Sequence, residues 1–153
     1  LKHLGEPLSS EIIKGMHCNL KEDVFEDLAN GYVAGDWKRR KNTVGGITTV
    51  LPDEVPKKIE ELLANKVTTI DDTSKFHAEF ERIHPFQDGN GRVGRMIILK
   101  QCLDNGIAPI IIFASDQEQY YEGLASAQNQ KDYSLLVELF KKEQERFKIR
   151  LRG

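Results

Sequence analysis

The polar segment from His84 to Arg95 restricts the fold more than any other part of the sequence, because helical patterns lie on both sides of it. The apolar stripe before it consists of Phe76, Phe80 and Ile83, and the apolar run after it of Met96, Ile97, Ile98, Leu99, Cys102 and Leu103. Pro85 disfavours helical geometry in the residue ahead of it. The first helix must therefore end before Pro85, and the second is expected to begin near Arg92 and to close at Gly106.

Apolar residues at helical spacing predict helices in the rest of the chain as well. A first helix should cover about residues 8–20 with Ser9 or Ser10 as its cap, and a short one with Val24, Phe25 and Leu28 should stop at Asn30-Gly31. Later helices are expected to start at Pro56, at Asp71 or Asp72, at a capping box of Ser115 and Glu118, and near Asp132, with Leu135, Leu136, Leu139 and Phe140 in the core.

One segment favours β structure. Strand-forming residues surround a pair of glycines there, namely Thr43, Val44, Ile47, Thr48, Thr49 and Val50 around Gly45-Gly46. The fold class we expect is therefore all-α, a helical bundle with a small β-hairpin. Because 153 residues with 39% hydrophobic content suit one compact core, we expect a single domain over residues 1–153.

Composition excludes several classes of partner. The 22 basic and 24 acidic residues nearly balance, which gives no reason to expect a nucleic-acid or membrane partner. No apolar run approaches the roughly 18 residues of a membrane span. The two cysteines, Cys18 and Cys102, lack metal-ligand spacing and are expected to be reduced thiols, so we expect a cytoplasmic protein.

The loop has the residues of an anion site. Gly89, Asn90 and Gly91 allow backbone N–H groups to converge at the positive end of the following helix. Arg92 and Arg95 lie three apart and so share one helix face, where their guanidinium groups suit phosphate oxygens. The sequence therefore predicts a site for several phosphates.

Two further residues suggest what happens to the phosphates. Asp88 would repel an anion unless a cation lay between them, and Mg²⁺ is usually held by a single carboxylate, water and phosphate. His84, at the other edge of the loop, could accept a proton from an attacking hydroxyl. The prediction is a magnesium-bound polyphosphate beside a general base.

Simpler interpretations exist for the same residues. The Asp-Gly-Asn-Gly run is typical of a turn, Phe86 is expected to be a core anchor, and His77, His3 and His17 are expected to be structural. Residues 89–94 also match the G-x-G-x-x-G pattern of dinucleotide-binding folds. That pattern requires a preceding strand and a parallel βαβ unit, which the sequence does not show.

The whole pattern His-x-Phe-x-Asp-Gly-Asn-Gly-Arg-x-x-Arg resembles the signature of the Fic family at every specified position. The resemblance implies a protein adenylyltransferase that moves AMP from ATP to a Ser, Thr or Tyr hydroxyl of a target protein and releases pyrophosphate. It implies His84 as the base, Asp88 as the Mg²⁺ ligand, and a phosphate site of Gly89, Asn90, Gly91, Arg92 and Arg95. The hairpin, at about residues 42–50, resembles the flap that docks the target. The residues expected in this flap are Thr43, Val44, Gly45, Gly46, Ile47 and Thr48.

Some features stay open at this stage. Lys38 stands where the family commonly has arginine, which leaves the anchoring of the flap uncertain. Ser134 and Glu138 have the spacing of an inhibitory motif but read as part of an amphipathic helix, so an antitoxin-like inhibitor or a segment outside these residues is expected. The sequence also leaves open transfer of UMP, phosphocholine or phosphate, a non-catalytic nucleotide-binding module, and a homo-oligomer.

Overall fold

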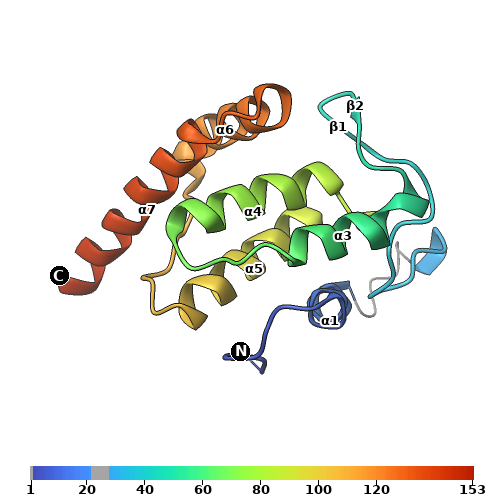
Figure 1. Cartoon of the computed structure of the whole chain (residues 1–153), viewed down its shortest axis with the longest axis horizontal. Helices are drawn as coiled ribbons and strands as arrows, with labels where there is room; N and C mark the ends of the chain where they lie inside the picture. The colour runs from blue at the N-terminus through green and yellow to red at the C-terminus, as the bar shows by residue number, and fades with distance from the viewer. Residues whose placement is uncertain (1, 22–27) are drawn as a thin grey trace. The chain divides into compact units, whose positions relative to one another are not determined.

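The computed structural model describes residues 2–21 and 28–153, and this part of the chain is mainly helical (Figure 1). Its elements are α1 (Ser10–Lys21), β1 (Thr43–Val44), β2 (Ile47–Thr48), η1 (Pro52–Glu54), α3 (Val55–Leu63), α4 (Ile70–Ile83), α5 (Asn90–Asp104), η2 (Ala114–Asp116), α6 (Gln117–Gln130) and α7 (Ser134–Arg152). The expected all-α bundle with one hairpin is confirmed. The Val24–Phe25 part of the expected short helix lies outside the described residues.

The chain divides into two compact units, and α4 and α5 each contribute to both. One unit consists of residues 5–65 and 80–96, and it contains α1, the hairpin, α3, the end of α4 and the start of α5. The other consists of residues 1–4, 66–79 and 97–153, and it contains α6 and α7. The loop from His84 to Arg95 and the hairpin therefore belong to the same unit.

Helices α1 and α3 form where the apolar spacing predicted them. Ser9 caps α1, since its Oγ accepts the N–H of Ile12 at 3.2 Å. Each helix buries one stripe, which in α1 consists of Ile12, Ile13 and Met16 and in α3 of Val55, Ile59 and Leu62. These stripes supply much of the apolar core of the unit that holds the hairpin.

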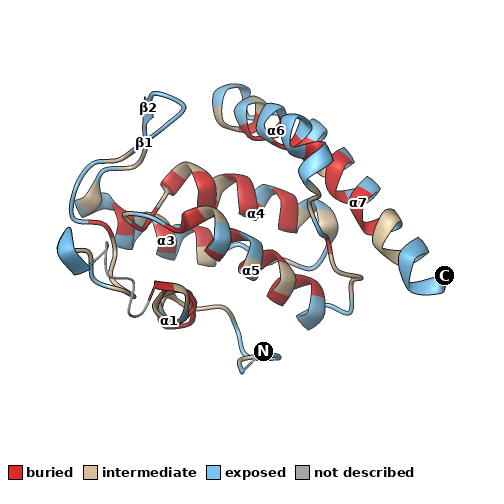
Figure 2. Cartoon of the chain, turned by 180° about the vertical axis from the view of Figure 1, so that it is seen from behind, coloured by how far each residue is buried: buried red, intermediate tan, exposed pale blue. Residues whose placement is uncertain are grey.

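The hairpin has the register that its glycines require. Thr43 pairs with Thr48 and Val44 with Ile47 in antiparallel order, and both residues of the connecting turn have positive φ, 57° at Gly45 and 80° at Gly46. Two consecutive positive φ angles are the geometry of the tight turns that match strand twist, and glycine adopts them without a Cβ penalty. All four strand residues are exposed, as the pale blue colour of the hairpin in Figure 2 shows.

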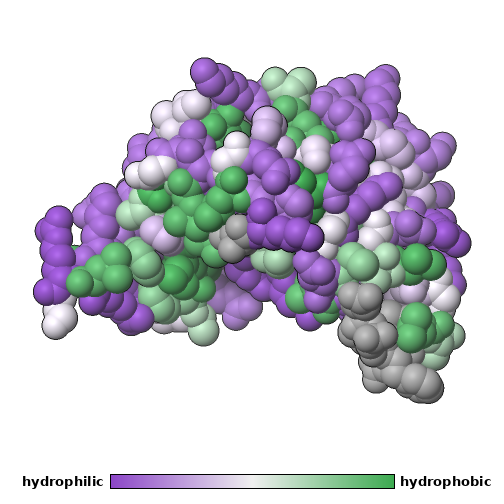
Figure 3. Space-filling model, turned by 90° about the horizontal axis from the view of Figure 1, so that it is seen from below, coloured by the Kyte–Doolittle hydropathy of each residue, from purple (hydrophilic) through white to green (hydrophobic). Residues whose placement is uncertain are grey.

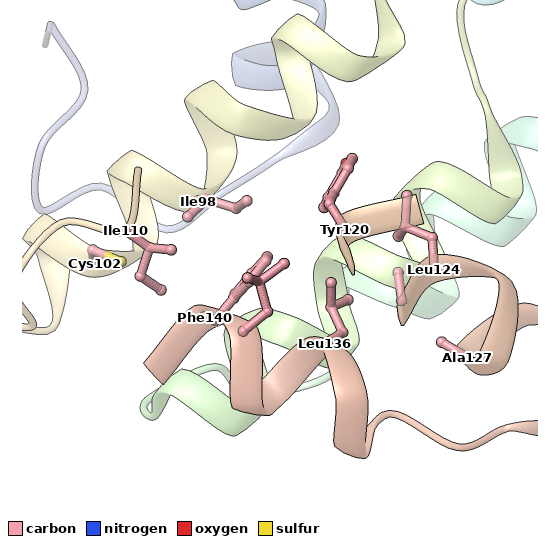
Figure 4. Packing of buried hydrophobic residues seen from close by; sticks show 10 residues of the cluster. Ile98, Cys102, Ile110, Tyr120, Leu124, Ala127, Leu136 and Phe140 are labelled. Carbon is pink, nitrogen blue, oxygen red and sulfur yellow. The ribbon is translucent and has the colours of Figure 1, made fainter. Parts of the chain in front are cut away.

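The core of the other unit joins side chains from four helices. Its buried cluster consists of Ala78, Ile98, Cys102, Ile110, Tyr120, Leu124, Ala127, Leu136, Leu139 and Phe140 (Figure 4). Helix α6 approaches α7 closely at Gly123, where an added Cβ would lie 3.2 Å from the backbone of Leu136. A glycine at this position lets the two helices pack at short range.

Several expected helix details were wrong. Thr69, and not Asp71 or Asp72, caps α4: its Oγ1 accepts the Asp72 N–H at 3.1 Å, while Asp72 Oδ2 accepts the Thr69 N–H at 3.1 Å. The expected capping box of Ser115 and Glu118 does not form, because a 3₁₀ turn precedes α6 and the Ser115 hydroxyl donates to Asp116. Asp116 is in turn held by Lys142 and Arg146.

Two further expectations need correction. Helix α5 begins at Asn90 and not at Arg92, so Gly91 lies inside the first turn of the helix and Gly89 directly precedes it. Leu135, expected in the core with Leu136 and Phe140, is 47% exposed, while those two are fully buried. The stripe of α7 is therefore narrower than its apolar residues suggested.

The surface mixes polar and apolar areas. The face drawn in Figure 3 is mainly hydrophilic, with apolar areas between the polar ones. Among the described residues, no helix combines the length and the apolar character needed to cross a bilayer.

The corrected cap of α4 predicts a difference between two substitutions. Thr69→Ala should lower the free energy of unfolding by about 1 kcal/mol, because it leaves an N–H of the first turn without its acceptor. Ser115→Ala should change it by less than about 0.5 kcal/mol, since Ser115 caps no helix. Urea unfolding of both variants measures the difference, and a larger loss in Ser115→Ala would contradict the assignment.

Candidate active site

The side-chain amide of Asn90 fixes the loop between α4 and α5. Its Oδ1 accepts the N–H of Phe86 and its Nδ2 donates to the Phe86 carbonyl, both at 2.8 Å, and Asn90 is 2% exposed. Phe86 is fully buried, and its ring stacks on His17 with the ring centroids 3.9 Å apart. Phe86 is thus the core anchor that the sequence predicted.

His84 lies directly after the last residue of α4 in a left-handed conformation. Its φ is 52°, which is uncommon for a residue other than glycine and costs about 1–3 kcal/mol. Its N–H still donates to the Phe80 carbonyl at 3.0 Å, so the helix continues to hold its backbone. Such strain is typical of functional positions, where the surrounding structure enforces it.

The surroundings of His84 favour the neutral form of its imidazole. Burial lowers the pKa of His84 because it disfavours the charged ring, and nearby Lys38 lowers it as well, while the Glu81 carbonyl and Asp88 act in the opposite direction. The nearest carboxylate oxygen to Nδ1 is Glu81 Oε2, at 3.9 Å. A neutral imidazole is the form that can accept a proton.

Glu81, one helical turn before His84, is an unusual carboxylate. It is 8% exposed, and its Oε1 is buried without a hydrogen-bond partner. Burial raises the pKa of Glu81 to about 7, and the positive charge of Arg95 only partly opposes this. Glu81 was not predicted as a site residue, although residues three apart at a helix end, such as Glu81 and His84, lie near each other.

The start of α5 has the features expected of an anion site. Gly89 has φ 84° just before the helix, and the first N–H groups of any α-helix lack acceptors within it. Arg92 and Arg95 are both exposed, and among the described residues Arg95 has no ion-pair partner. Asn90 can contribute only its backbone, because its side chain is engaged by Phe86.

Asp88 is ionised and accessible. The ammonium of Lys21 lies 2.7 Å from Asp88 Oδ2 and is the main reason that the pKa of Asp88 is lowered, and Arg92 Nη2 lies 3.8 Å from the same oxygen. The side chain is 59% exposed and lines a cavity of about 190 Å³. A ligand can therefore reach a carboxylate that keeps its charge.

His17 supports Asp88 from α1. Its Nδ1 accepts the N–H of Gly35 at 2.9 Å, and its Nε2 pairs with the Asp88 carbonyl at 3.0 Å. A carbonyl only accepts, so Nε2 carries the proton and both ring nitrogens are engaged. The structural role expected for His17 is what this geometry gives.

In the described part of the chain, no three or more His, Cys, Asp or Glu side chains are grouped so that they could hold a metal ion. His77 pairs instead with the Tyr120 hydroxyl at 2.6 Å, and Cys18 and Cys102 are free thiols. A metal ion at the loop would thus need ligands from substrate or water beside Asp88.

Comparison with known sequences decides the family. The sequence profile of the Fic/DOC family matches residues 7–102, which include the whole loop and the hairpin. The chain belongs to the Fic/DOC family. A probable protein adenylyltransferase from Aquifex aeolicus is 31% identical over 113 residues, which cover 69% of this chain and 35% of that protein. The protein adenylyltransferase fic-1 of Caenorhabditis elegans is 28% identical over 98 residues, 60% of this chain and 19% of that one.

Solved structures of Fic proteins have the same fold. A Fic domain containing signaling protein from Bacteroides thetaiotaomicron superposes with a TM-score of 0.77 at 22% identity, covering 93% of this chain and 61% of that one. A Fic family protein from Desulfovibrio desulfuricans gives 0.73 at 25% identity, covering 94% and 47%. The Fic chain described here spans about a third or less of the length of the curated relatives above.

Three residues at the candidate site of this Fic-family chain were left open or were not predicted from the sequence: Lys21, Lys38 and Glu81. Lys21 contacts Asp88, which lies 67 residues further along the chain, and Lys38 contacts the carbonyl of Ile83, 45 residues further. Helical periodicity reports neighbours within a few turns and carries no signal for such contacts.

The buried carboxyl of Glu81 predicts a pH-dependent stability difference. Its pKa in the folded chain, about 7, lies above the ordinary 4.5, so its contribution is complete below about pH 4.5 and is lost as the pH rises through about 7. Relative to the unmutated chain, Glu81→Gln should gain up to about 3 kcal/mol of unfolding free energy between about pH 4.5 and 8.

Urea unfolding at several pH values measures this difference. Glu122→Gln, which replaces an exposed carboxylate, is the matched control and should follow the unmutated chain at every pH. A constant difference between Glu81→Gln and the unmutated chain would contradict a buried carboxyl that titrates near neutral pH.

Proposed function

We propose that this Fic-family chain is a protein adenylyltransferase that transfers AMP from ATP to a Ser, Thr or Tyr hydroxyl of a target protein. The observation that carries the proposal is a loop that places a buried, strained His84 at one end and, at the other end, the start of α5 with its open N–H groups and two exposed arginines. The curated relatives named as protein adenylyltransferases support the same reaction.

His84 would act as the general base. The target hydroxyl oxygen would form a bond to the α-phosphorus of ATP while the bond between the α-phosphorus and the bridging oxygen breaks, and pyrophosphate would leave. The hydroxyl proton would pass to the imidazole. A pKa lowered by burial keeps the ring free to receive it, and such a base contributes roughly 10²–10⁴-fold to the rate.

The start of α5 would hold the triphosphate. Backbone N–H groups at Gly91 and Arg92 and the helix dipole favour negative charge there. Arg92 and Arg95 would grip the β- and γ-phosphates with charge-assisted hydrogen bonds. Because reacting atoms must lie close and in line, a firm hold on the phosphate tail also aligns the α-phosphate with the hydroxyl.

Asp88 would hold Mg²⁺. The donor set fits the ion, since the carboxylate is ionised, accessible, and free of other protein carboxylates among its described contacts. Phosphate oxygens and water would complete the coordination, and the ion would neutralise charge on the phosphates. Lys21 and Arg92 offset the charge of Asp88 in the protein alone.

The hairpin would dock the target. Val44 is 42% and Ile47 57% exposed on two short strands, which present apolar side chains and backbone groups to an incoming segment. An extended peptide can add to such a sheet edge by main-chain hydrogen bonds. The residues proposed for this role are Thr43, Val44, Gly45, Gly46, Ile47 and Thr48.

Arg95 would also be the docking point of an inhibitor. It is exposed and has no ion-pair partner in the described ranges, so a glutamate from a separate antitoxin-like protein or from another segment could occupy it. The Ser134–Glu138 pair does not supply this glutamate in our proposal, because Ser134 bonds Asp132 at the start of α7. Regulation would then act by excluding the γ-phosphate.

Mass spectrometry of a cell lysate incubated with this chain, Mg²⁺ and ATP tests the function. The expected result is a peptide that carries one AMP on a hydroxyl side chain. Parallel incubations with UTP and CDP-choline separate the related group transfers. A modification by phosphate alone, or only with one of the other donors, would contradict AMP transfer.

Replacing the base should separate binding from chemistry. His84→Ala is expected to reduce AMP incorporation by at least about 10²-fold and to leave ATP affinity within about twofold, because a general base stabilises the transition state and not bound ATP. Calorimetry and labelled incorporation measure the two quantities. Equal losses of rate and affinity would mean that His84 binds nucleotide and does not act as the base.

Replacing the second arginine should distinguish two nucleotides. Arg95→Ala is expected to weaken ATP by about 10–100-fold and ADP far less, since a charge-assisted hydrogen bond contributes about 1.5–3 kcal/mol and only ATP carries the γ-phosphate. Calorimetry with both nucleotides measures the ratio. Equal losses would assign Arg95 to the β-phosphate or to the fold.

A further inference from the structure

Lys38 contacts the backbone on both sides of His84. Its N–H donates to the Pro85 carbonyl at 2.8 Å, and its Nζ donates to the Ile83 carbonyl at 3.2 Å. The carbonyls immediately before and after His84 are therefore both held by one residue. His84, which lies between these two carbonyls, is the residue with the strained φ of 52°.

The same ammonium holds both ends of the hairpin. Lys38 Nζ donates to Asn42 Oδ1 and to Thr49 Oγ1, each at 2.7 Å. The base of the hairpin is closed by the Thr49 N–H, which donates to the Asn42 carbonyl at 3.2 Å. With the Ile83 carbonyl, these acceptors use all three donors of the ammonium. In Figure 1 the hairpin rises beside the end of α4.

Asn42 extends the connection to the loop. Its Nδ2 donates to the Phe86 carbonyl at 2.9 Å, the same carbonyl that accepts from Asn90. A continuous set of hydrogen bonds thus runs from the hairpin through Lys38 and Asn42 to the first residue of α5. Every member of this set lies in the same compact unit.

Stability alone does not favour a lysine at this position. Lys38 is 4% exposed, and its side-chain acceptors are a carbonyl, an amide oxygen and a hydroxyl, none of them a carboxylate. Burial lowers the pKa of Lys38 to about 8, which reports the cost of keeping this charge out of water. A buried charge is costly unless it is compensated, and here the compensation comes only from the three hydrogen bonds that the ammonium donates.

We propose that Lys38 is a positioning residue that fixes the target-docking hairpin and the backbone of His84 relative to each other. A target segment that pairs with the hairpin then presents its hydroxyl to an imidazole held by the same side chain. The proposal rests on the transfer reaction proposed above. It also answers how the hairpin is anchored with a lysine at position 38, which the sequence alone left open.

Amide hydrogen exchange without nucleotide tests the anchoring independently of activity. In Lys38→Met, which keeps the apolar stem and removes the donors, the Thr49 amide and the amides of 43–48 should exchange at least about tenfold faster. Lys38→Arg, which retains donors, should stay within about threefold of the unmutated chain. Unchanged exchange in Lys38→Met would overturn the proposal.

A second variant is used if Lys38→Met does not fold. Lys38→Gln cannot reach all three acceptors, so its hairpin amides should also exchange faster than in the unmutated chain. Unchanged exchange in Lys38→Gln would overturn the proposal equally.

The link to chemistry is measured by incorporation of AMP, labelled on the α-phosphate, into lysate protein at saturating ATP. Lys38→Met should lower the rate by about 10²-fold, as misplacement of a reacting group does, while ATP affinity stays within about twofold and Lys38→Arg recovers most of the rate. Faster exchange with an unchanged rate would overturn the positioning role. Absence of transfer by the unmutated chain would instead refute the proposed function, and the exchange result would still decide whether Lys38 anchors the hairpin.

Discussion

The rest of the site depends on one interaction, the pair of hydrogen bonds that joins the Asn90 side chain to the backbone N–H and carbonyl of Phe86. It replaces the hydrogen bonds that a loop between two helices would otherwise leave unmade in a buried place, where an unmade bond costs about 1–3 kcal/mol. It also sets where α5 begins. The carbonyl of Phe86 accepts from Asn42 as well, so the hairpin is connected to the same point.

Charge is distributed unevenly around this loop. Asp88 has Lys21 and Arg92 beside it. His84 lies near the carboxyl of Glu81, which is largely protonated below about pH 7. Arg95 makes no ion pair in the parts of the chain that the structure describes, and its positive charge acts on the buried carboxyl of Glu81. The exposed guanidinium of Arg95 and the open N–H groups of α5 leave a positive field at the loop, which suits a polyphosphate.

The candidate site could be predicted from the sequence because its chemistry is contiguous. His84, Asp88 and the two arginines lie within twelve residues, and two adjacent glycines mark the hairpin turn. The residues that hold the site in place could not be predicted from the sequence. Lys21, Lys38 and Asn42 contact their partners only after the chain folds back. Local rules failed in a similar way at Ser115, whose hydroxyl bonds Asp116 in a network with Lys142 and Arg146 from α7.

We propose that the loop places the α-phosphate of ATP against His84. Parallel incubations of the chain and lysate with ATP labelled on the α-phosphate or on the γ-phosphate test this placement. We expect the α-label to become covalently attached to protein and the γ-label to leave as pyrophosphate. Attachment of the γ-label, or release of both labels without attachment, would contradict it.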